Sequence, residues 1–281
     1  MIGIIGRGFV GSAVQFGFSP NVGFDIKIRV YDKDPSKSTH TLEQVVNKSE
    51  IVFISIPTPS FIDGKINLEL LDNCLNDINK ISNYKAIFLI RSTVIPGTTR
   101  KLSEKYPSLK LVFNPEFLTE RSAKLDFINQ SRVVLGGNLY EVDKVADLYI
   151  SRFGKSLPII RTNYESAELI KYMTNTFLAT KISFLNDMKI LSEKSGCVWE
   201  DVIDGFIRDG RIGNSHLNIP GPDGKFGFGG SCFPKDIQAI IHYANDLGID
   251  MSVLKGAWKT NLKVRPERDW EKLEGRAITK K

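Results

Sequence analysis

The sequence contains few cysteines and no long apolar run. Its three cysteines, Cys74, Cys197 and Cys232, are an odd number without the spacing of a zinc site or a disulfide framework. We therefore expect no metal site and a reducing, cytoplasmic location. No stretch reaches about eighteen apolar residues, so no membrane-spanning helix or membrane partner is expected. The apolar stretch that begins at Met1 is too short for a signal peptide.

The basic residues are concentrated at one end of the chain. Of the net charge of +6, the segment from Lys255 onward carries +5, because it holds nine Lys or Arg and four Asp or Glu. A nucleic-acid-binding domain carries its basic stripe on the folded body, so this distribution predicts no nucleic-acid partner and a solvated charged tail at 265–281. The 281 residues are enough for one large domain and one smaller domain.

A glycine motif follows the first apolar stretch. Residues 1–5 predict a strand, and Gly6-Arg7-Gly8-Phe9-Val10-Gly11 leads from it into a segment with helical periodicity. A second predicted strand, Ile28–Asp32, ends in an acid at the spacing of a ribose-binding carboxylate. This pattern predicts dinucleotide binding and favours NAD over NADP. Lys33 and Lys37 leave a 2′-phosphate open as an alternative.

Apolar runs and helical patterns alternate up to residue 162. We expect an α/β fold, with an N-terminal Rossmann-type doubly wound parallel sheet at 1–162. The further predicted strands are Ile51–Ile56, Ala86–Ile90, Leu109–Phe113, Arg132–Leu135 and Leu157–Ile160, and the predicted helices are Leu68–Ile81, Gly97–Tyr106 and Tyr140–Phe153. Polar residues at the carboxyl ends of the strands are candidate ligand contacts, although Ser, Thr, Pro and Asn also form ordinary turns.

From residue 163 the pattern predicts an all-α central domain that extends to residue 264. Tyr164–Lys194 contains neither Gly nor Pro and has apolar residues at helical spacing. A helix of this length spans about 45 Å, which is more than a small domain needs, so we expect it to form a homodimer interface. Lys171 and Asn175 are four residues apart and are expected on one face. Shorter helices are predicted at Trp199–Arg208, Pro234–Leu247 and Ser252–Val264, with a loop over 209–226.

The segment GFGGSCFPKD at 227–236 places a thiol at the start of a predicted helix. Pro234 is typical of a first helical position, and Lys235 and Asp236 fall in the first turn. Backbone N–H groups at a helix start and a nearby ammonium both favour thiolate over thiol, so the pattern predicts a reactive Cys232. A glycine-rich turn with a buried structural cysteine is the alternative interpretation.

These motifs together resemble the nucleotide-sugar dehydrogenases of the UDP-glucose/GDP-mannose dehydrogenase family, most closely the UDP-glucose 6-dehydrogenases. The resemblance rests on the sequences GRGFVG, PTP at 57–59, STVIPGTT at 92–99, NPEFLTE at 114–120, AELIKYMTNTFLATKISFLND at 167–187, RIG at 211–213 and the cysteine motif. It implies an NAD-dependent enzyme that oxidises a primary alcohol of a nucleotide sugar to a carboxylate in two hydride transfers. The implied reaction is UDP-glucose to UDP-glucuronate, through a thiohemiacetal and a thioester on Cys232.

The resemblance also implies the roles of individual residues. The implied catalytic residues are Cys232, Lys171, Asn175, Asp236, Glu120 and Thr93. The implied NAD contacts are Gly6, Gly8, Phe9, Val10, Gly11, Asp32, Lys37, Thr58, Thr93, Glu120 and Lys235. The implied substrate contacts are Glu116, Phe117, Leu118, Thr119, Glu120, Lys171, Asn175, Arg211 and Gly229. Of these, Arg211 matches an arginine that reaches the substrate phosphate of a second subunit.

One departure from the family concerns length. Family members usually continue into a further Rossmann-like domain that closes over the UDP, so we expect a short form, a fragment or a chain completed by another. Two alternatives to UDP-glucose oxidation are left open. One is oxidation of another sugar nucleotide, UDP-N-acetylhexosamine or GDP-mannose. The other is a nonenzymatic subunit that binds NAD or a sugar nucleotide.

Overall fold

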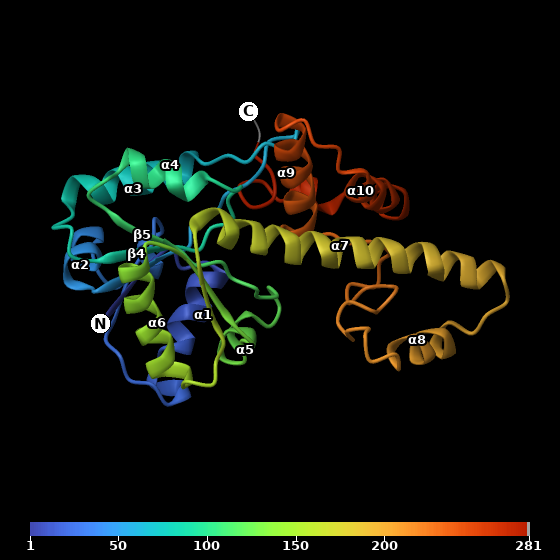
Figure 1. Ribbon diagram of the computed structural model, residues 1–281, viewed down its shortest axis with the longest axis horizontal. Coiled ribbons are helices and arrows are strands. Elements are labelled where there is room, and N and C mark those ends of the chain that lie inside the picture. The colour runs from blue at the N-terminus through green and yellow to red at the C-terminus, as the bar shows by residue number, and fades with distance from the viewer. Residues whose placement is uncertain (280–281) are drawn as a thin grey trace. The chain divides into compact units, whose positions relative to one another are not determined.

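The computed structural model describes residues 1–279, which form two compact units (Figure 1). The first unit comprises Met1–Thr58 and Leu68–Lys171, and the second comprises Pro59–Asn67 and the chain from Tyr172 onward. Helix α7 (Tyr164–Lys194) has the bounds that the sequence predicts, and it continues from the first unit into the second. The division between the two compact units therefore falls inside this helix, between Lys171 and Tyr172.

The first unit is built on a seven-stranded sheet with the order β2-β1-β3-β4-β5-β6-β7. The strands are β1 (Ile2–Ile5), β2 (Ile28–Tyr31), β3 (Ile51–Ile54), β4 (Ile87–Ile90), β5 (Lys110–Phe113), β6 (Val133–Gly137) and β7 (Ile159–Thr162). Each predicted strand is confirmed. The first five strands are parallel and in close register, so that Ile5 pairs with both Tyr31 and Ile54. Their carboxyl ends therefore share one edge of the sheet.

The last two strands correct the prediction of a fully parallel sheet. Strand β6 is antiparallel to β5, and β7 is parallel to β6. The helix between β5 and β6 is α5 (Ala123–Ile128), which has six residues and packs on α1 (Phe9–Gly17). Six helical residues rise only about 9 Å, less than the length of a four-residue strand. The chain therefore stays at the carboxyl edge of β5 and enters β6 from that side.

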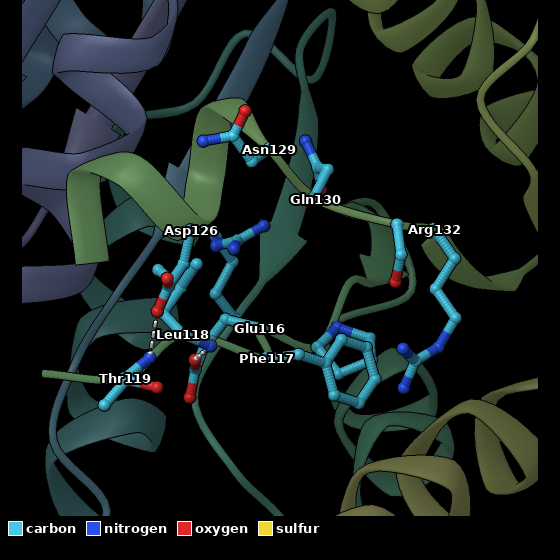
Figure 2. Close-up of a pocket in the computed structure, with 11 residues that line it drawn as sticks. Glu116, Phe117, Leu118, Thr119, Asp126, Asn129, Gln130 and Arg132 are labelled. Carbon is cyan, nitrogen blue, oxygen red and sulfur yellow. Dashed lines mark hydrogen bonds between the residues drawn. The ribbon is translucent and has the colours of Figure 1, made fainter. Parts of the chain in front are cut away.

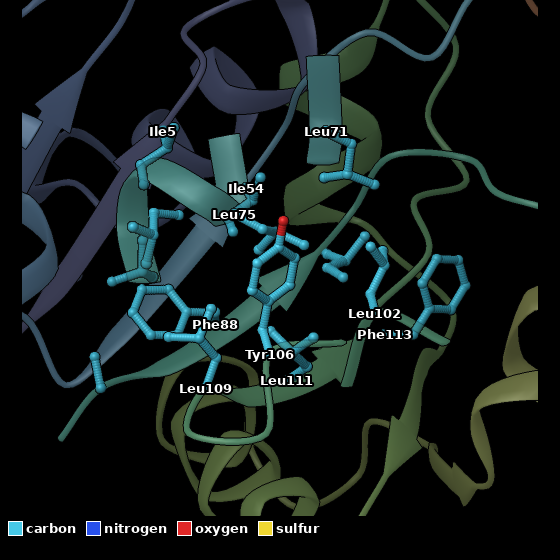
Figure 3. Packing of buried hydrophobic residues seen from close by; sticks show 14 of the residues in the cluster. Ile5, Ile54, Leu71, Leu75, Phe88, Leu102, Tyr106, Leu109, Leu111 and Phe113 are labelled. Carbon is cyan, nitrogen blue, oxygen red and sulfur yellow. The ribbon is translucent and has the colours of Figure 1, made fainter. Parts of the chain in front are cut away.

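Helices cover both faces of this sheet (Figure 1). One face is covered by α2 (Leu42–Lys48), α3 (Glu69–Ile81) and α4 (Thr98–Lys105). The other is covered by α1, α5 and α6 (Leu139–Phe153). Because side chains alternate along a strand, Ile5 points to the first face and Ile4 to the second, and both are buried. Figure 3 shows the first of these cores, in which Leu71 and Leu75 of α3 pack with the strand residue Phe88.

Two helices of the first unit, α2 and α5, are not among the predicted ones. Helix α2 begins with a capping box, in which Thr41 accepts from the backbone N–H of Gln44 and the Gln44 side chain accepts from that of Thr41. This S/T-x-x-E/Q signature was readable in the sequence. Helix α5 has no side-chain cap at Ser122 and carries no comparable signal.

The second unit is helical, as predicted. Besides the later part of α7, it contains α8 (Trp199–Ile207), α9 (Phe233–Asp246) and α10 (Ser252–Val264). Residues 208–232 form no helix or strand, which agrees with the predicted loop. One apolar core joins α7, α9 and α10, and another joins α7, α8 and the loop. None of the described helices combines the length and apolar character needed to cross a bilayer.

The prediction of a solvated tail from residue 265 onward is wrong for Arg265, Trp270 and Ala277, which are buried, whereas the charged residues between them are mostly exposed. Arg265 and Trp270 are 3% and 2% exposed, and the Trp270 ring lies 5.2 Å from that of Trp258 on α10. Further along, the backbones of Ala277 and Thr279 pair with Ser60 in the inserted segment 59–67. The positive charge of this stretch hid the two features that fold it, which are an apolar tryptophan and an arginine with carboxylate partners.

Candidate active site

The glycine turn after β1 has the geometry predicted for it. Gly6 has a φ of +88°, and a side chain there would overlap the carbonyl of Ser55. A side chain at Gly11 would overlap the carbonyl of Gly6, so α1 can start this close to the strand only because both are glycine. Gly8 is exposed, with no atom within 4 Å of an added Cβ. Within residues 1–279, no side chain caps α1 and no acid lies in its first turn. The helix start can therefore accept an anion.

Asp32 lies beside this turn, as its predicted role requires. Its carboxylate accepts from the backbone N–H of Arg7 at 2.5 Å and from that of Asp34 at 2.9 Å. The acid at the end of β2 is thus tied to the glycine turn at the end of β1. Lys37 is half exposed and pairs with Asp34 at 3.4 Å, while its backbone carbonyl accepts from Arg7.

The loops after β3 and β4 are bonded to each other. Thr58 donates to the carbonyl of Thr93 at 2.7 Å, and the Ser92 hydroxyl donates to the carbonyl of Ile56 at 2.6 Å. Two of the predicted site residues, Thr58 and Thr93, are therefore in direct contact. Their loops lie at the carboxyl edge of the sheet, where ligands of such folds bind.

Lys171 and Glu116 form a buried ion pair in the first unit. The Lys171 Nζ donates to the Glu116 Oε1 at 2.9 Å and to the Glu116 carbonyl at 2.6 Å, and both side chains are less than a tenth exposed. The other oxygen of Glu116 accepts from the N–H of Leu118 at 2.7 Å. The predicted substrate segment after β5 is thereby fastened to α7.

A pocket of about 290 Å³ opens beside this segment (Figure 2). It is lined by Arg91, Pro115, Glu116, Phe117, Leu118, Thr119, Asp126, Asn129, Gln130, Ser131 and Arg132. The structure therefore brings the predicted substrate residues 116–119 together at one cavity. Its walls carry carboxylates, amides and guanidinium groups as well as the Phe117 ring, over which the Arg132 guanidinium lies at 4.1 Å. This mixture suits a ligand with many hydroxyl groups.

A second pocket, of about 370 Å³, contains two other predicted residues. Phe9 and Glu120 line it together with Ser12 and residues 121–125. Phe9 is the first residue of α1, next to the glycine turn. The structure thus brings Glu120, predicted to contact NAD and substrate, to the start of the predicted cofactor helix.

Glu168 is a buried carboxylate that the sequence analysis did not single out. Its two oxygens accept from the backbone N–H groups of Gly97 and Thr99 at 2.6 and 2.7 Å, at the start of α4. Burial raises the pKa of Glu168 to about 7, against hydrogen bonds from Thr99 and Gly97 that lower it. Its position three residues before Lys171 was the only signal available.

In the second unit, Cys232 occupies the N-cap of α9. Pro234 stands at the start of the helix, and Lys235 and Asp236 lie in its first turn, which confirms the predicted local geometry. Cys232 is half-buried, and its sulfur lies 3.7 Å from the Ser231 hydroxyl. Cys74, in contrast, sits on α3 in the first unit, where burial raises the pKa of its thiol to about 12. Of the two, only Cys232 has a helix start to stabilise a thiolate.

A buried polar cluster surrounds the first turn of α9. Asp236 is 1% exposed and accepts from the Asn175 amide at 2.6 Å and from the Lys235 ammonium at 2.6 Å. The predicted catalytic residues Asn175 and Asp236 are thus in contact, through α7 and α9. Lys235, predicted as a cofactor contact, serves here as the charge partner of Asp236.

Two further predicted residues differ in their surroundings. Arg211 is 87% exposed on its side chain and pairs with Asp209, so its predicted role toward a second subunit is untested. Gly229 has no room for a side chain, because an added Cβ would meet the Arg265 guanidinium and an Asp269 oxygen. Among residues 1–279, no group of three or more His, Cys, Asp or Glu is placed to hold a metal ion.

The predicted catalytic residues are divided between the units. Thr93, Glu120 and Lys171 belong to the first, whereas Asn175, Cys232 and Asp236 belong to the second. Within each unit the structure confirms contacts among the predicted site residues. Their catalytic and binding roles stay predictions.

Comparison with known proteins matches both units to one family. Residues 26–151 match the NAD binding domain of the UDP-glucose/GDP-mannose dehydrogenase family, and residues 165–263 match the central domain of the same family. The cofactor prediction, NAD, agrees with the description of the first of these domains.

The relatives include named dehydrogenases. The UDP-glucose 6-dehydrogenase of Rickettsia typhi is 38% identical over 240 residues, which cover 84% of this chain and 54% of that protein. The UDP-glucose 6-dehydrogenase TuaD of Bacillus subtilis is 35% identical over 234 residues, covering 81% of this chain and 49% of TuaD. The solved UDP-glucose dehydrogenase of Pyrobaculum islandicum superposes with a TM-score of 0.82 at 28% identity, covering 97% of this chain and 70% of that one. The chain thus spans about half the length of the curated relatives it matches.

Proposed function

Because this chain belongs to the UDP-glucose/GDP-mannose dehydrogenase family, we propose that it is an NAD-dependent dehydrogenase that oxidises UDP-glucose to UDP-glucuronate in two steps. The main support is the placement of Cys232 at the N-cap of α9, directly before the buried Lys235–Asp236 pair. The names of the relatives support the choice of UDP-glucose. The cytoplasmic location is part of the same proposal.

The residues of the first unit fit NAD. Gly8 leaves open space over an uncapped helix start, which suits a pyrophosphate, and the Asp32 carboxylate can accept from a ribose hydroxyl. The linked loops of Thr58 and Thr93 lie at the same edge of the sheet. NAD, when bound, takes up a hydride from the substrate carbon in each oxidation.

Cys232 serves as the nucleophile for the second oxidation. In the first, the C6 alcohol loses a proton to a base and a hydride to become an aldehyde. The Cys232 thiolate then adds to the aldehyde carbon and forms the oxyanion of a thiohemiacetal, which can lose a second hydride and become a thioester. Water attacks the thioester, gives its two protons to the general base and to solvent, releases the carboxylate product and returns the sulfur as a thiolate. The four electrons lost by the substrate leave as two hydrides.

The buried polar groups support these steps. Asp236, with a carboxylate held by Asn175 and Lys235, is the candidate to accept the hydroxyl proton through a water molecule. Lys171 and Asn175 are donors that stabilise the developing oxyanion. In the hydrolysis, Glu120 acts as general base and Thr93 positions the water. Glu116 keeps Lys171 oriented until substrate binds.

The decisive experiment measures NADH released per UDP-glucose, for the wild type and for Cys232→Ser. We expect two NADH per sugar from the wild type and a stalled or aldehyde-bound enzyme after one from the variant. A reduction of the overall rate on the order of 10³-fold or more is expected for loss of a nucleophile. Equal two-step turnover by both proteins would remove the thioester from the mechanism.

Two alternatives are tested by the same assay. A panel with UDP-N-acetylhexosamine and GDP-mannose shows whether another sugar nucleotide is the substrate. NAD binding without NADH release on any of them would support the nonenzymatic subunit. The presence of all six implied catalytic residues favours an enzyme, because a decayed enzyme would be expected to have lost some of them.

We also propose that the protein is a homodimer through α7. Large apolar side chains on this helix are exposed, including Met173 (70%), Phe177 (67%), Phe184 (52%) and Leu191 (55%). At 100° per residue they lie within one narrow stripe, which is a typical interface pattern. Arg211 would then reach the site of the second subunit. Light scattering that gives a monomer for the wild type, or an unchanged dimer for Phe177→Ser, would contradict this assembly.

A further inference from the structure

The loop that leads to Cys232 is held by three side chains from other parts of the second unit. Asn186 accepts from the Gly227 N–H at 3.0 Å. Asn261 accepts from the Phe228 N–H at 2.7 Å and donates to its carbonyl at 3.0 Å. Asp269 accepts from the Gly230 N–H at 2.9 Å, two residues before the thiol. Asp269 therefore provides the bond nearest to Cys232.

Asp269 is itself fixed on two sides. Its other oxygen accepts from the Nε of Arg265 at 2.6 Å, and Trp270, the next residue, is buried. Arg265 is buried and also donates to Asp223 at 2.6 Å and to the Phe226 carbonyl at 3.3 Å. Burial acts to raise the pKa of Asp269, but hydrogen bonds from Arg265 and the Gly230 backbone lower this pKa below its ordinary value. The carboxylate is therefore ionised at neutral pH and holds its place.

The glycines of the loop are fitted to this arrangement. An added Cβ at Gly229 would meet Arg265 and Asp269, and one at Gly227 would meet Asn261. The loop thus lies directly against the side chains that bond it. This packing accounts for glycine at position 229 without any contact with substrate.

We propose that Asp269, oriented by Arg265, is a positioning residue that holds the thiol of Cys232 at the N-terminus of α9. The proposal rests on the proposed function, because it concerns the same nucleophile. Asp269 acts through the Gly230 N–H and has no part in the chemistry itself. Loss of this bond frees the loop and moves the sulfur away from the helix start that favours its thiolate.

The test is alkylation of Cys232 by iodoacetamide as a function of pH, followed by mass spectrometry. Cys197 is exposed and provides a reference rate in the same molecule. Asp269→Ala removes the bond to Gly230 and one carboxylate of Arg265. The matched control is Asp223→Ala, which removes the other carboxylate of Arg265 but has no bond to Gly230. Asp269→Asn keeps an acceptor for the Gly230 N–H.

For Asp269→Ala we expect the midpoint pH of Cys232 alkylation to rise by a few tenths of a unit, the size expected for loss of a helix-end interaction, while Cys197 is unchanged. Asp223→Ala should keep the wild-type midpoint, and Asp269→Asn should lie closer to wild type than Asp269→Ala. Equal midpoints for Asp269→Ala and wild type, or an equal shift in Asp223→Ala, would overturn the proposal. If Asp269→Ala does not fold, Asp269→Leu and Asp223→Leu, which keep the branched shape of the side chain but remove the acceptor, give the same comparison by the same criterion.

Turnover separates this proposal from the proposed function. With UDP-glucose, we expect Asp269→Ala to slow the second NADH release at least tenfold more than the first, with the KM for the sugar nucleotide little changed. If the wild type releases no NADH but the alkylation midpoints still differ as expected, the positioning role stands and the proposed function fails.

Discussion

Among residues 1–279, each unit contains one buried lysine–carboxylate pair, and the two pairs are built differently. In the first unit, Lys171 on α7 reaches Glu116, which is 55 residues away in sequence, and fastens the segment after β5 to the helix. In the second unit, Lys235 and Asp236 are neighbours in one helical turn, and the distant partner is the neutral amide of Asn175. The first pair links two elements, whereas the second is local.

This difference determines how the loss of each ion pair would affect the protein. A pair that links elements keeps a binding segment in place, so its loss affects the fold as well as the chemistry. The second pair lies within one helical turn, and the link between α7 and α9 is made by the Asn175 amide instead. The loop before Cys232 then needs its own anchors, which Asn261 and Asp269 provide.

The largest expected effect on stability comes from breaking the pair that links two elements. Lys171→Met leaves Glu116 buried without its ammonium, and we expect the free energy of unfolding to fall by about 3–5 kcal/mol. Urea denaturation measures this loss of stability. The control is Lys105→Met, which breaks the exposed pair with Asp72 and should lower the free energy of unfolding far less, because water screens this pair. Similar losses in the two variants would mean that the Lys171 pair is not buried in solution.

Next in size is the pH dependence due to Glu168 in the first unit. A carboxyl whose pKa rises from 4.5 to about 7 on folding binds more protons in the folded than in the unfolded state between these values. The free energy of unfolding therefore falls as pH rises through this window, by about 3 kcal/mol in total.

Glu168→Gln removes this titration. Between pH 4.5 and 8, the free energy of unfolding should therefore fall less for Glu168→Gln than for the wild type. Thermal unfolding across this range measures the difference. Parallel curves for the two proteins would show that Glu168 has an ordinary pKa. The Glu165 charge, which also raises the pKa of Glu168, is present in both proteins.

The smallest expected effects separate packing from ligand contact in the glycine turn. Gly11→Ala places a Cβ against the Gly6 carbonyl and should cost about 1–3 kcal/mol of stability. The Cβ that Gly8→Ala adds meets no atom within 4 Å, so the free energy of unfolding of this variant should stay within about 0.5 kcal/mol of wild type. Its added methyl lies where a pyrophosphate would approach, so NAD affinity should fall about tenfold. Unchanged NAD affinity in Gly8→Ala would place the cofactor elsewhere.

Most of the fold could be predicted because its signals are local. The strands of the first unit are continuous apolar runs, and α7 shows an unbroken helical period without Gly or Pro. The reversal of β6 could not be predicted, since it depends on the length and packing of α5, a short helix without a capping signal. The folded stretch 265–279 was missed because its charge resembles that of a loose tail.

The residues of the candidate site also differ in how far they could be predicted from the sequence. The glycine turn after β1 and the position of Cys232 at a helix start follow from residues close in sequence, and both were predicted. The contacts of Glu168 with α4 and of Asp269 with Gly230 join residues 39 or more positions apart. An acid in a helix or after one is common on any surface, so neither residue had a distinguishing pattern.

By itself, the sequence determined the succession of strands and helices, the glycine turn and the thiol at the start of α9, because periodicity, backbone freedom and helix-end electrostatics act over a few residues. Only the tertiary structure decided which carboxylates are buried and which backbone N–H groups they accept from. Those contacts depend on how distant segments pack, and a buried carboxylate must be paired or hydrogen-bonded wherever the packing places it.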